Sequence, residues 1–195
     1  TALFAQNWAP AGDKIKTPWA DKVSPDNVWR EYPRPQFERE NWMNLNGLWK
    51  YSILKQNQPQ PQNFQGEILV PFCVESSLSG VAKEVKPDDR IWYKRQFEIP
   101  ANWKGKSVVL NFEAVDYSTT VWLNGAIVGS HKGGFDRFSF DISPFLKEKG
   151  IQELVVSVTD PSSAGPQARG KQQLSQGGIW YTPVSGIWQT VWMEA

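Results

Sequence analysis

The sequence predicts an all-β protein: a two-sheet antiparallel β-sandwich of jelly-roll type with an extended N-terminal arm. From residue 47 onward, short segments repeatedly alternate apolar and polar residues with a period of two. A two-residue turn signal joins two of these segments, and no apolar stripe of helical period is longer than two turns. About eight short strands with turn signals between them are typical of a two-sheet sandwich.

The strand patterns are those of half-buried antiparallel strands, with one apolar and one polar face. In one of them, Val108, Leu110 and Phe112 alternate with Asn111 and Glu113. The segments that share this pattern are 91–99, 107–113, 120–124, 137–142 and 153–159. Each is expected to place its apolar face in the core of the sandwich.

Turn and cap residues punctuate the strands. Asn124-Gly125 separates two apolar triplets, and it predicts a two-residue hairpin because both central positions need a positive φ. One short helix is expected where Ser143 caps, Pro144 takes the first turn and Lys149-Gly150 ends it.

Residues 1–44 show no clean periodicity and are interpreted as an arm that packs on a sandwich formed by residues 45–195. Ser24-Pro25-Asp26 predicts a short helical turn within the arm. Residues 1–5 fit the tail of a secretory leader, and an arbitrary chain boundary explains them about as well. A periplasmic or secreted location is expected, with a cytoplasmic one left open.

Composition excludes several classes of function. The chain has 195 residues and a formal net charge of +1, so neither nucleic acid nor a membrane is an expected partner. With Cys73 as the only cysteine, no disulfide can form within the chain, and neither a metal nor another cofactor is expected. The only histidine, His131, is expected at the surface near a turn. The 11 tryptophans suit a large aromatic core, and they also suit stacking on sugar rings.

Several stretches resemble the N-terminal sugar-binding domain of glycoside hydrolase family 2, which includes β-galactosidases, β-glucuronidases and β-mannosidases. The quoted sequences, which together span residues 33 to 194, are PRPQFERENWMNLNGLWKY at 33–51, VPFCVESSLSG at 70–80, IWYKRQF at 91–97, VVLNFEAVDYSTTVWLNGAIVG at 108–129, GGFDRFSFDI at 133–142 and GGIWYTPVSGIWQTVWME at 177–194.

The resemblance implies a galactose-binding-domain-like jelly roll followed by an immunoglobulin-like sandwich and a catalytic (β/α)₈ barrel. The barrel would carry both catalytic glutamates of a retaining mechanism. Since this chain ends at Ala195, before either glutamate, no catalytic residue is assigned and the chain alone is not expected to be an enzyme. Its partners would be carbohydrate and those later domains. The parent would hydrolyse O-glycosidic bonds in carbohydrate metabolism, as β-galactosidases do.

The resemblance also points to the segment before the last strand as a source of sugar contacts. In some β-galactosidases this segment supplies an Asp, but residues 178–183 contain no acid. Trp180 and Tyr181 are the candidates for stacking on sugar, or they fill a gap between domains. Arg169, Lys171 and Gln172 are polar candidates, with a solvated loop as the alternative.

The last strand is apolar on both faces, because Trp188 and Trp192 lie opposite Ile187, Val191 and Met193. The two tryptophans are therefore candidates for an interface, covered either by a missing domain or by the N-terminal arm. Two alternatives to an accessory domain remain open at this point: a free-standing carbohydrate-binding module and a purely structural interaction sandwich.

Overall fold

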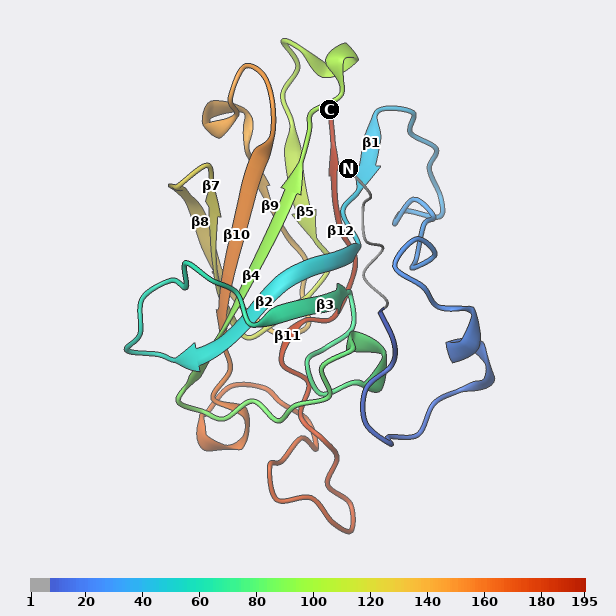
Figure 1. Cartoon of the computed structure of the whole chain (residues 1–195), viewed down its shortest axis with the longest axis vertical. Coiled ribbons are helices and arrows are strands. Elements are labelled where there is room, and N and C mark those ends of the chain that lie inside the picture. Colours follow the sequence, from blue (N-terminus) through green and yellow to red (C-terminus); the bar gives the residue numbers. More distant parts are fainter. Residues whose placement is uncertain (1–7) are drawn as a thin grey trace.

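The computed structural model describes residues 8–195 as two antiparallel sheets packed face to face, with long loops at one end (Figure 1). The leader remnant expected at residues 1–5 lies outside the described residues. No α-helix occurs between residues 8 and 195, and none of that part of the chain could span a membrane as a helix. The predicted all-β sandwich is confirmed.

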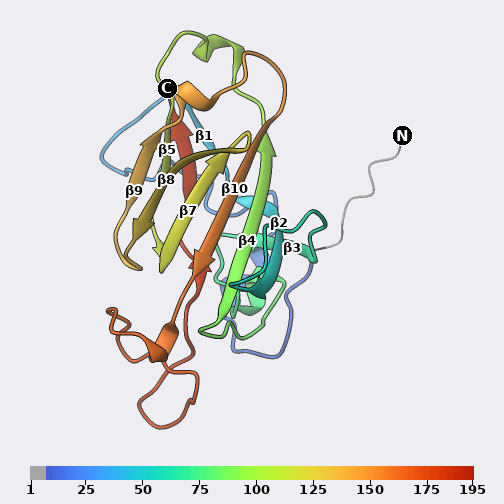
Figure 2. The same ribbon diagram turned by 90° about the vertical axis from the view of Figure 1, so that its left-hand side faces the viewer.

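The larger sheet has six strands, and Figure 2 shows how they lie side by side. In spatial order they are β3 (Gly66–Val70), β2 (Gly47–Lys55), β4 (Asp89–Phe97), β10 (Gln152–Thr159), β7 (Ser118–Leu123) and β8 (Ala126–Lys132). All neighbours pair antiparallel, so strands distant in sequence, such as β4 and β10, lie side by side.

The second sheet has four strands, and a two-stranded ladder adjoins it. In spatial order the four are β1 (Trp42–Asn44), β12 (Val191–Glu194), β5 (Val109–Phe112) and β9 (Phe138–Asp141). The ladder joins β11 (Gly186–Ile187) to β6 (Val115–Asp116). Five 3₁₀ turns complete the described elements: η1 (Pro18–Lys22), η2 (Ser77–Ser79), η3 (Ala101–Trp103), η4 (Ser143–Phe145) and η5 (Ser162–Ala164).

The core fills the space between the two sheets, as the alternating patterns predict. Trp49, Tyr93 and Leu154 of the six-stranded sheet and Phe112 and Met193 of the four-stranded sheet are all fully buried. The predicted hairpin is also confirmed: Asn124 (φ 53°) and Gly125 (φ 85°) link β7 to β8. Here the sequence pattern succeeds because apolar alternation and turn chemistry agree.

Three local expectations were wrong. The helix expected from Ser143 to Gly150 is a single 3₁₀ turn, because an extended backbone at Leu146 ends it. Ser24-Pro25-Asp26 forms no helical turn; it belongs to a tight turn in which the Asn27 N–H donates to the Ser24 carbonyl. His131 is half-buried rather than at the surface: its ring stacks on Phe138, with 4.2 Å between the ring centroids.

From residue 8 the arm runs along the outside of the sandwich, and Trp42–Asn44 pair with β12 as β1 of the four-stranded sheet (Figure 1). The Tyr32 ring packs edge-on against Trp192, and the Arg34 guanidinium lies 5.3 Å from the same ring. Of the two covers left open for Trp192, the structure shows the arm. The division at residue 44 into arm and sandwich stays a prediction.

Gly186 provides a test of close packing between β11 and the core. A Cβ at this residue would lie 2.0 Å from the Tyr93 hydroxyl, and its φ is 86°. Gly186→Ala should therefore destabilise the chain by about 2–4 kcal/mol, from backbone strain and overpacking together. Urea unfolding measures this. Gly150→Ala is the matched control, since it has a similar φ of 81° with open space around its Cβ. Equal losses in the two variants would show that the Tyr93 contact is unimportant.

Candidate functional site

The long loop between β10 and β11, residues 160–185, projects from one end of the sandwich. It lies at the bottom of both Figure 1 and Figure 2. All five residues predicted to touch sugar belong to this loop. Loops carried by a rigid scaffold are where binding residues concentrate.

A buried hydrogen-bond network ties the two ends of the loop to the sandwich. Asp160, directly after β10, accepts bonds from the Ser162 N–H (2.7 Å) and the Ser185 hydroxyl (2.8 Å). The Ser185 N–H in turn donates to Glu75 Oε2 over 3.0 Å. All four side chains are nearly inaccessible to solvent. Ser185 thus links two carboxyl groups that lie far apart in the sequence.

A third buried carboxyl group, Asp116, lies at the same end of the sandwich. It belongs to β6, where it pairs with Gly186, and its side chain is hydrogen-bonded to Gln172 of the loop. A Cβ at Gly134 would lie 2.6 Å from the Asp116 carboxyl group, so only glycine fits there without movement. The Gly134 carbonyl accepts a bond from Trp188 Nε1 at 2.8 Å.

Burial makes these carboxyl groups reluctant to ionise. It raises the pKa of Glu75 to about 7, and with the neighbouring charge of Asp160 it raises the pKa of Asp116 to about 7. Burial also raises the pKa of Asp160, which its bonds from Ser162 and Ser185 partly offset. Part of this cluster is therefore protonated near neutral pH, and a protonated carboxyl group can donate as well as accept a hydrogen bond.

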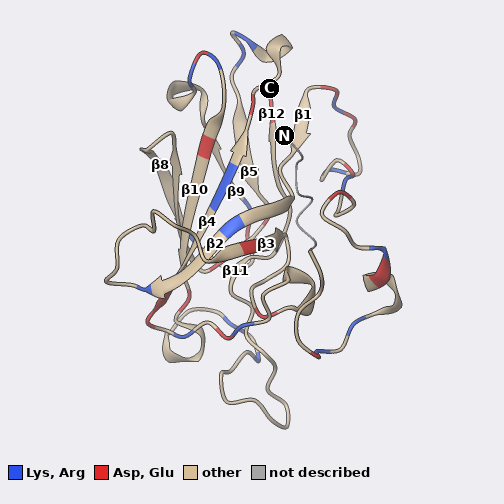
Figure 3. Cartoon of the chain, viewed as in Figure 1, with Lys and Arg blue, Asp and Glu red and all other residues tan. Residues whose placement is uncertain are grey.

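The outer part of the loop exposes aromatic side chains on an uncharged segment. Residues 172–183 contain no Lys, Arg, Asp or Glu (Figure 3). Trp180 is 39 % exposed and Tyr181 is 64 % exposed. The Tyr181 N–H donates to the Lys171 carbonyl, and the Gln173 N–H donates to the Tyr181 carbonyl. These two hydrogen bonds hold the backbone of the tip in place. Exposed rings on a held backbone suit stacking against a sugar ring.

The polar candidates occupy different places in the loop. Gln172 faces inward: its Oε1 accepts from the Val184 N–H, and its side chain also reaches Asp116. Arg169 is half-buried, and its Nη1 donates to the Gly165 carbonyl. Lys171 is exposed. The structure therefore brings Trp180, Tyr181 and Lys171 to the surface, whereas Gln172 serves the interior. Sugar binding by all five stays a prediction.

The two interface candidates, Trp188 and Trp192, differ in their exposure to solvent. Trp192 is only 2 % exposed, and its Nε1 donates to Glu113 Oε1 at 2.8 Å, so it offers no surface to another domain. Trp188 is half-buried and lines a hollow of about 350 Å³. Phe135, which is 57 % exposed, packs edge-on against it with ring centroids 6.2 Å apart. Trp188 and Phe135 together form an exposed aromatic surface.

Sequence reasoning missed the carboxyl cluster. None of Glu75, Asp116 and Asp160 was singled out, because no spacing in the sequence marks them as a group. One signal was available: Asp160 directly follows β10, whose residues Leu154–Val158 are buried. An acid directly after such a strand follows a stretch of backbone that is buried on both faces, so burial of the acid itself is expected. Within residues 8–195, no group of three His, Cys, Asp or Glu could hold a metal.

The raised pKa values predict how stability depends on pH. The folded state holds protons on Glu75 and Asp116 that the unfolded chain releases above about pH 4, so the stability that these two groups contribute is fully present below about pH 4 and is lost as pH rises through about 7. Each of these two carboxyl groups should lower the free energy of unfolding by about 1–2 kcal/mol over this rise in pH, after allowance for solvent screening. Urea unfolding of wild type and Asp116→Asn between pH 5 and pH 8 measures it.

In Asp116→Asn the loss between the two pH values should shrink, because the amide does not titrate. Asp26→Asn, at an exposed acid, is the control and should keep the wild-type slope. An identical slope in all three proteins would contradict the assignment of Asp116 as a buried, protonated group.

Relatives of this chain include a β-galactosidase and a β-glucuronidase. The chain is 31 % identical over 105 residues to a β-galactosidase of Thermoanaerobacter pseudethanolicus, covering 53 % of this chain and 13 % of that protein. It is 29 % identical over 118 residues to a β-glucuronidase of Paenibacillus borealis, covering 57 % and 20 %. The chain thus spans a fifth or less of the length of these relatives.

Solved structures agree on the fold. A Lactobacillus rhamnosus β-glucuronidase matches 80 % of this chain and 29 % of its own, with a TM-score of 0.61 and 24 % identity. A Ruminococcus gnavus β-glucuronidase matches 85 % and 30 %, with a TM-score of 0.58 and 23 % identity. The family described as "Glycosyl hydrolases family 2, sugar binding domain" matches residues 81–193, more than half of the chain. The chain therefore belongs to the sugar-binding domain family of family 2 glycosyl hydrolases.

Proposed function

We propose that this chain is a non-catalytic accessory domain whose 160–185 loop forms one wall of a sugar pocket that a separate catalytic domain completes. The parent protein would hydrolyse O-glycosidic bonds by a retaining mechanism, with both catalytic carboxyl groups in a later barrel. A β-galactosidase-like activity is the first expectation, and the relatives that are β-glucuronidases make a glucuronide the second. A periplasmic or secreted location belongs to the same proposal.

The observation that carries this proposal is the contrast between the anchor and the tip of the loop. Asp160, Ser185 and Glu75 hold its ends in a buried network, while Trp180 and Tyr181 stand exposed on an uncharged tip. A ring held in place loses little conformational entropy on binding, so an anchored tip favours a ligand that stacks. Its openness favours a pocket that needs a second wall, because ligand sites generally enclose most of the ligand.

Trp188 and Phe135 supply the second part of the proposal, a surface for the catalytic domain. The hollow that Trp188 lines also contains Trp29, Pro33 and Gln189, so apolar rings lie beside amide and carboxyl groups. This composition resembles the core and rim of a protein interface. The immunoglobulin-like sandwich and the barrel are the partners proposed for it.

Removal of the exposed rings should impair the longer protein that contains this domain. Trp180→Ala or Tyr181→Ala should lower kcat/KM for a nitrophenyl glycoside by about tenfold, because one stacking contact is lost in the transition state. Steady-state kinetics with galactoside and glucuronide substrates measures this. Trp19→Ala, which removes an exposed indole from η1, is the control and should leave kcat/KM unchanged.

Titration of the isolated chain separates this proposal from a free-standing binding module. With galactose, lactose, glucuronic acid and mannose, the accessory-domain proposal expects neither turnover nor sub-millimolar binding at the loop, because the second wall is missing. Sub-millimolar binding that Trp180→Ala abolishes would instead support the module. Unchanged kinetics in both loop variants of the longer protein would overturn the proposed role of the loop.

A further inference from the structure

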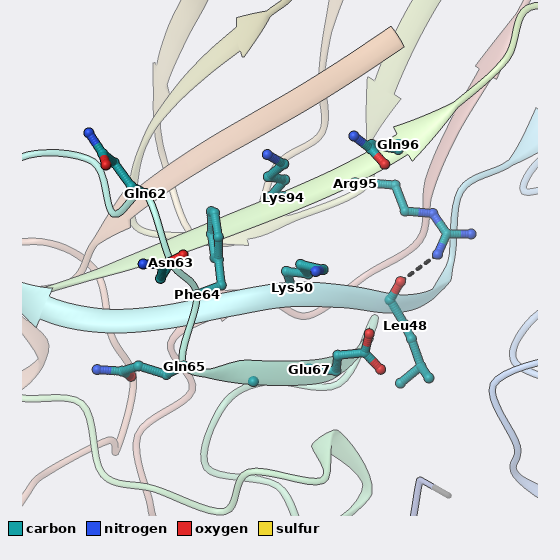
Figure 4. A pocket seen from close by; sticks show the side chains of 11 residues that line it. Leu48, Lys50, Gln62, Asn63, Phe64, Gln65, Glu67, Lys94, Arg95 and Gln96 are labelled. Atoms are coloured by element: carbon teal, nitrogen blue, oxygen red, sulfur yellow. Dashed lines mark hydrogen bonds between the residues drawn. The ribbon is translucent and has the colours of Figure 1, made fainter. Parts of the chain in front are cut away.

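A second, polar hollow lies on the six-stranded sheet, away from the 160–185 loop. It has a volume of about 650 Å³ and lies over β3, β2 and β4, beneath the segment that joins β2 to β3 (Figure 4). The residues that line it are Leu48, Lys50, Gln62, Asn63, Phe64, Gln65, Gly66, Glu67, Lys94, Arg95 and Gln96. None of them comes from the loop of the proposed sugar pocket, so we call this hollow the sheet groove.

The floor of the sheet groove carries positive charge. Lys50 of β2 and Lys94 of β4 are direct cross-strand partners, and both lie within the groove (Figure 4). Lys50 also has Glu67 of β3 as its cross-strand partner on the other side, so a carboxylate faces it as well. Like charges at opposed positions destabilise a sheet, and a bound anion would relieve what remains of the repulsion between Lys50 and Lys94. Lys94 also forms an ion pair of 2.6 Å with Glu153, which lies outside the lining. Arg95 adds a third cation at one end, against the single carboxylate of Glu67, so the lining has a formal charge of +2, counted as three cations minus one anion.

Arg95 is held in its position. Its Nη1 donates to the Leu48 carbonyl, drawn as a dashed line in Figure 4, and its Nε is buried without a hydrogen-bond partner in the part of the chain described. Burial, together with the charge of Arg30, lowers the pKa of Arg95 from its ordinary value. A guanidinium presents its donors in a planar fork that matches a carboxylate, so a held Arg95 suits an anionic ligand.

The wall of the groove is anchored rather than loose. The Gln65 side chain accepts from the Ile53 N–H at 3.0 Å and donates to the Ile53 carbonyl at 3.2 Å, as a strand neighbour would. The Gln65 N–H donates to the Ser52 hydroxyl. This anchor fixes Phe64, whose ring lies 5.8 Å from the Lys94 ammonium. The groove thus has an ordered aromatic ring beside its cations.

Amide groups complete the lining. Gln62 and Asn63 from the wall and Gln96 from β4 make no side-chain hydrogen bond within residues 8–195, and all three are exposed. An amide can both donate to and accept from a hydroxyl group. The groove therefore combines cations, an aromatic ring and free amides, which match carboxylates, C–H faces and hydroxyl groups in turn.

We propose that the sheet groove binds an acidic oligosaccharide, a chain of sugar rings that carries carboxylate groups. Lys50, Lys94 and Arg95 contact the carboxylates, Phe64 packs against a ring face, and the amides bond to hydroxyl groups. The inference goes beyond the proposed function, because it assigns a second binding site on a different surface of the domain. It holds whether or not the 160–185 loop contacts sugar.

The test is calorimetric titration of the whole 195-residue chain with tetragalacturonate at low and at high salt. We expect binding that weakens as salt rises, and Lys50→Glu should weaken it by at least about tenfold. Lys106→Glu makes the same charge change at an exposed lysine outside the groove and should change affinity by less than about twofold. Gln62→Glu, on the exposed wall, should also weaken binding if Lys50→Glu fails to fold.

Two further titrations show where the acidic oligosaccharide binds and whether its charge matters. Trp180→Ala should bind tetragalacturonate like wild type, which distinguishes the sheet groove from the loop. A neutral tetrasaccharide, cellotetraose, should bind at least about tenfold more weakly than tetragalacturonate, because it offers no charge to the cations. The absence of tetragalacturonate binding, equal affinity for cellotetraose, or equal losses in Lys50→Glu and Lys106→Glu would each overturn the proposal.

Discussion

The hydrogen bonds of Ser185 to Asp160 and Glu75 are the constraint on which the functional end of the sandwich depends. A loop of this length has a large entropic cost of ordering. Ser185 closes the loop because its hydroxyl and its N–H each bond to a different buried carboxyl group. The ladder of β11 and β6 begins at the next residue, so the same point also sets the position of Asp116.

This arrangement explains why the domain tolerates three buried acids. Each carboxyl group would be costly if it were ionised without partners, and the raised pKa values of Glu75 and Asp116 describe that cost. Hydrogen bonds to the carboxyl groups from Ser162, Ser185 and Gln172 offset part of this cost. Functional sites often contain such local conflicts with the rules of stability, and here the conflict lies at the base of the loop that carries the exposed Trp180 and Tyr181.

Sequence patterns predicted the parts of the fold that depend on local chemistry. The alternation in Val108, Leu110 and Phe112 and the turn at Asn124-Gly125 both appear in the structure as expected. The helix after Ser143 failed because capping residues favour a helix start but cannot supply an apolar face that holds the helix. Patterns left open whether the arm or another domain covers Trp192, because the contact with Tyr32 joins segments far apart in the chain.

The candidate site was predicted only in part, for the same reason. The resemblance located the loop and its exposed rings, but Glu75, Asp116 and Asp160 meet only through the tertiary structure, and no spacing in the sequence reveals them. The sheet groove likewise arises from a cross-strand pair, Lys50 and Lys94, whose register depends on the whole sheet. Sites of this kind become visible only when strands distant in sequence are paired.

Backbone hydrogen exchange in the chain and in Ser185→Ala tests most directly whether this network holds the loop. The variant loses the hydroxyl that bonds to Asp160 and keeps the N–H that bonds to Glu75. We predict that the amides of Gln173, Tyr181 and Val184 exchange roughly tenfold faster or more in the variant, while the amides of β4 and β10 are unchanged. Unchanged exchange at those three loop amides would contradict the account.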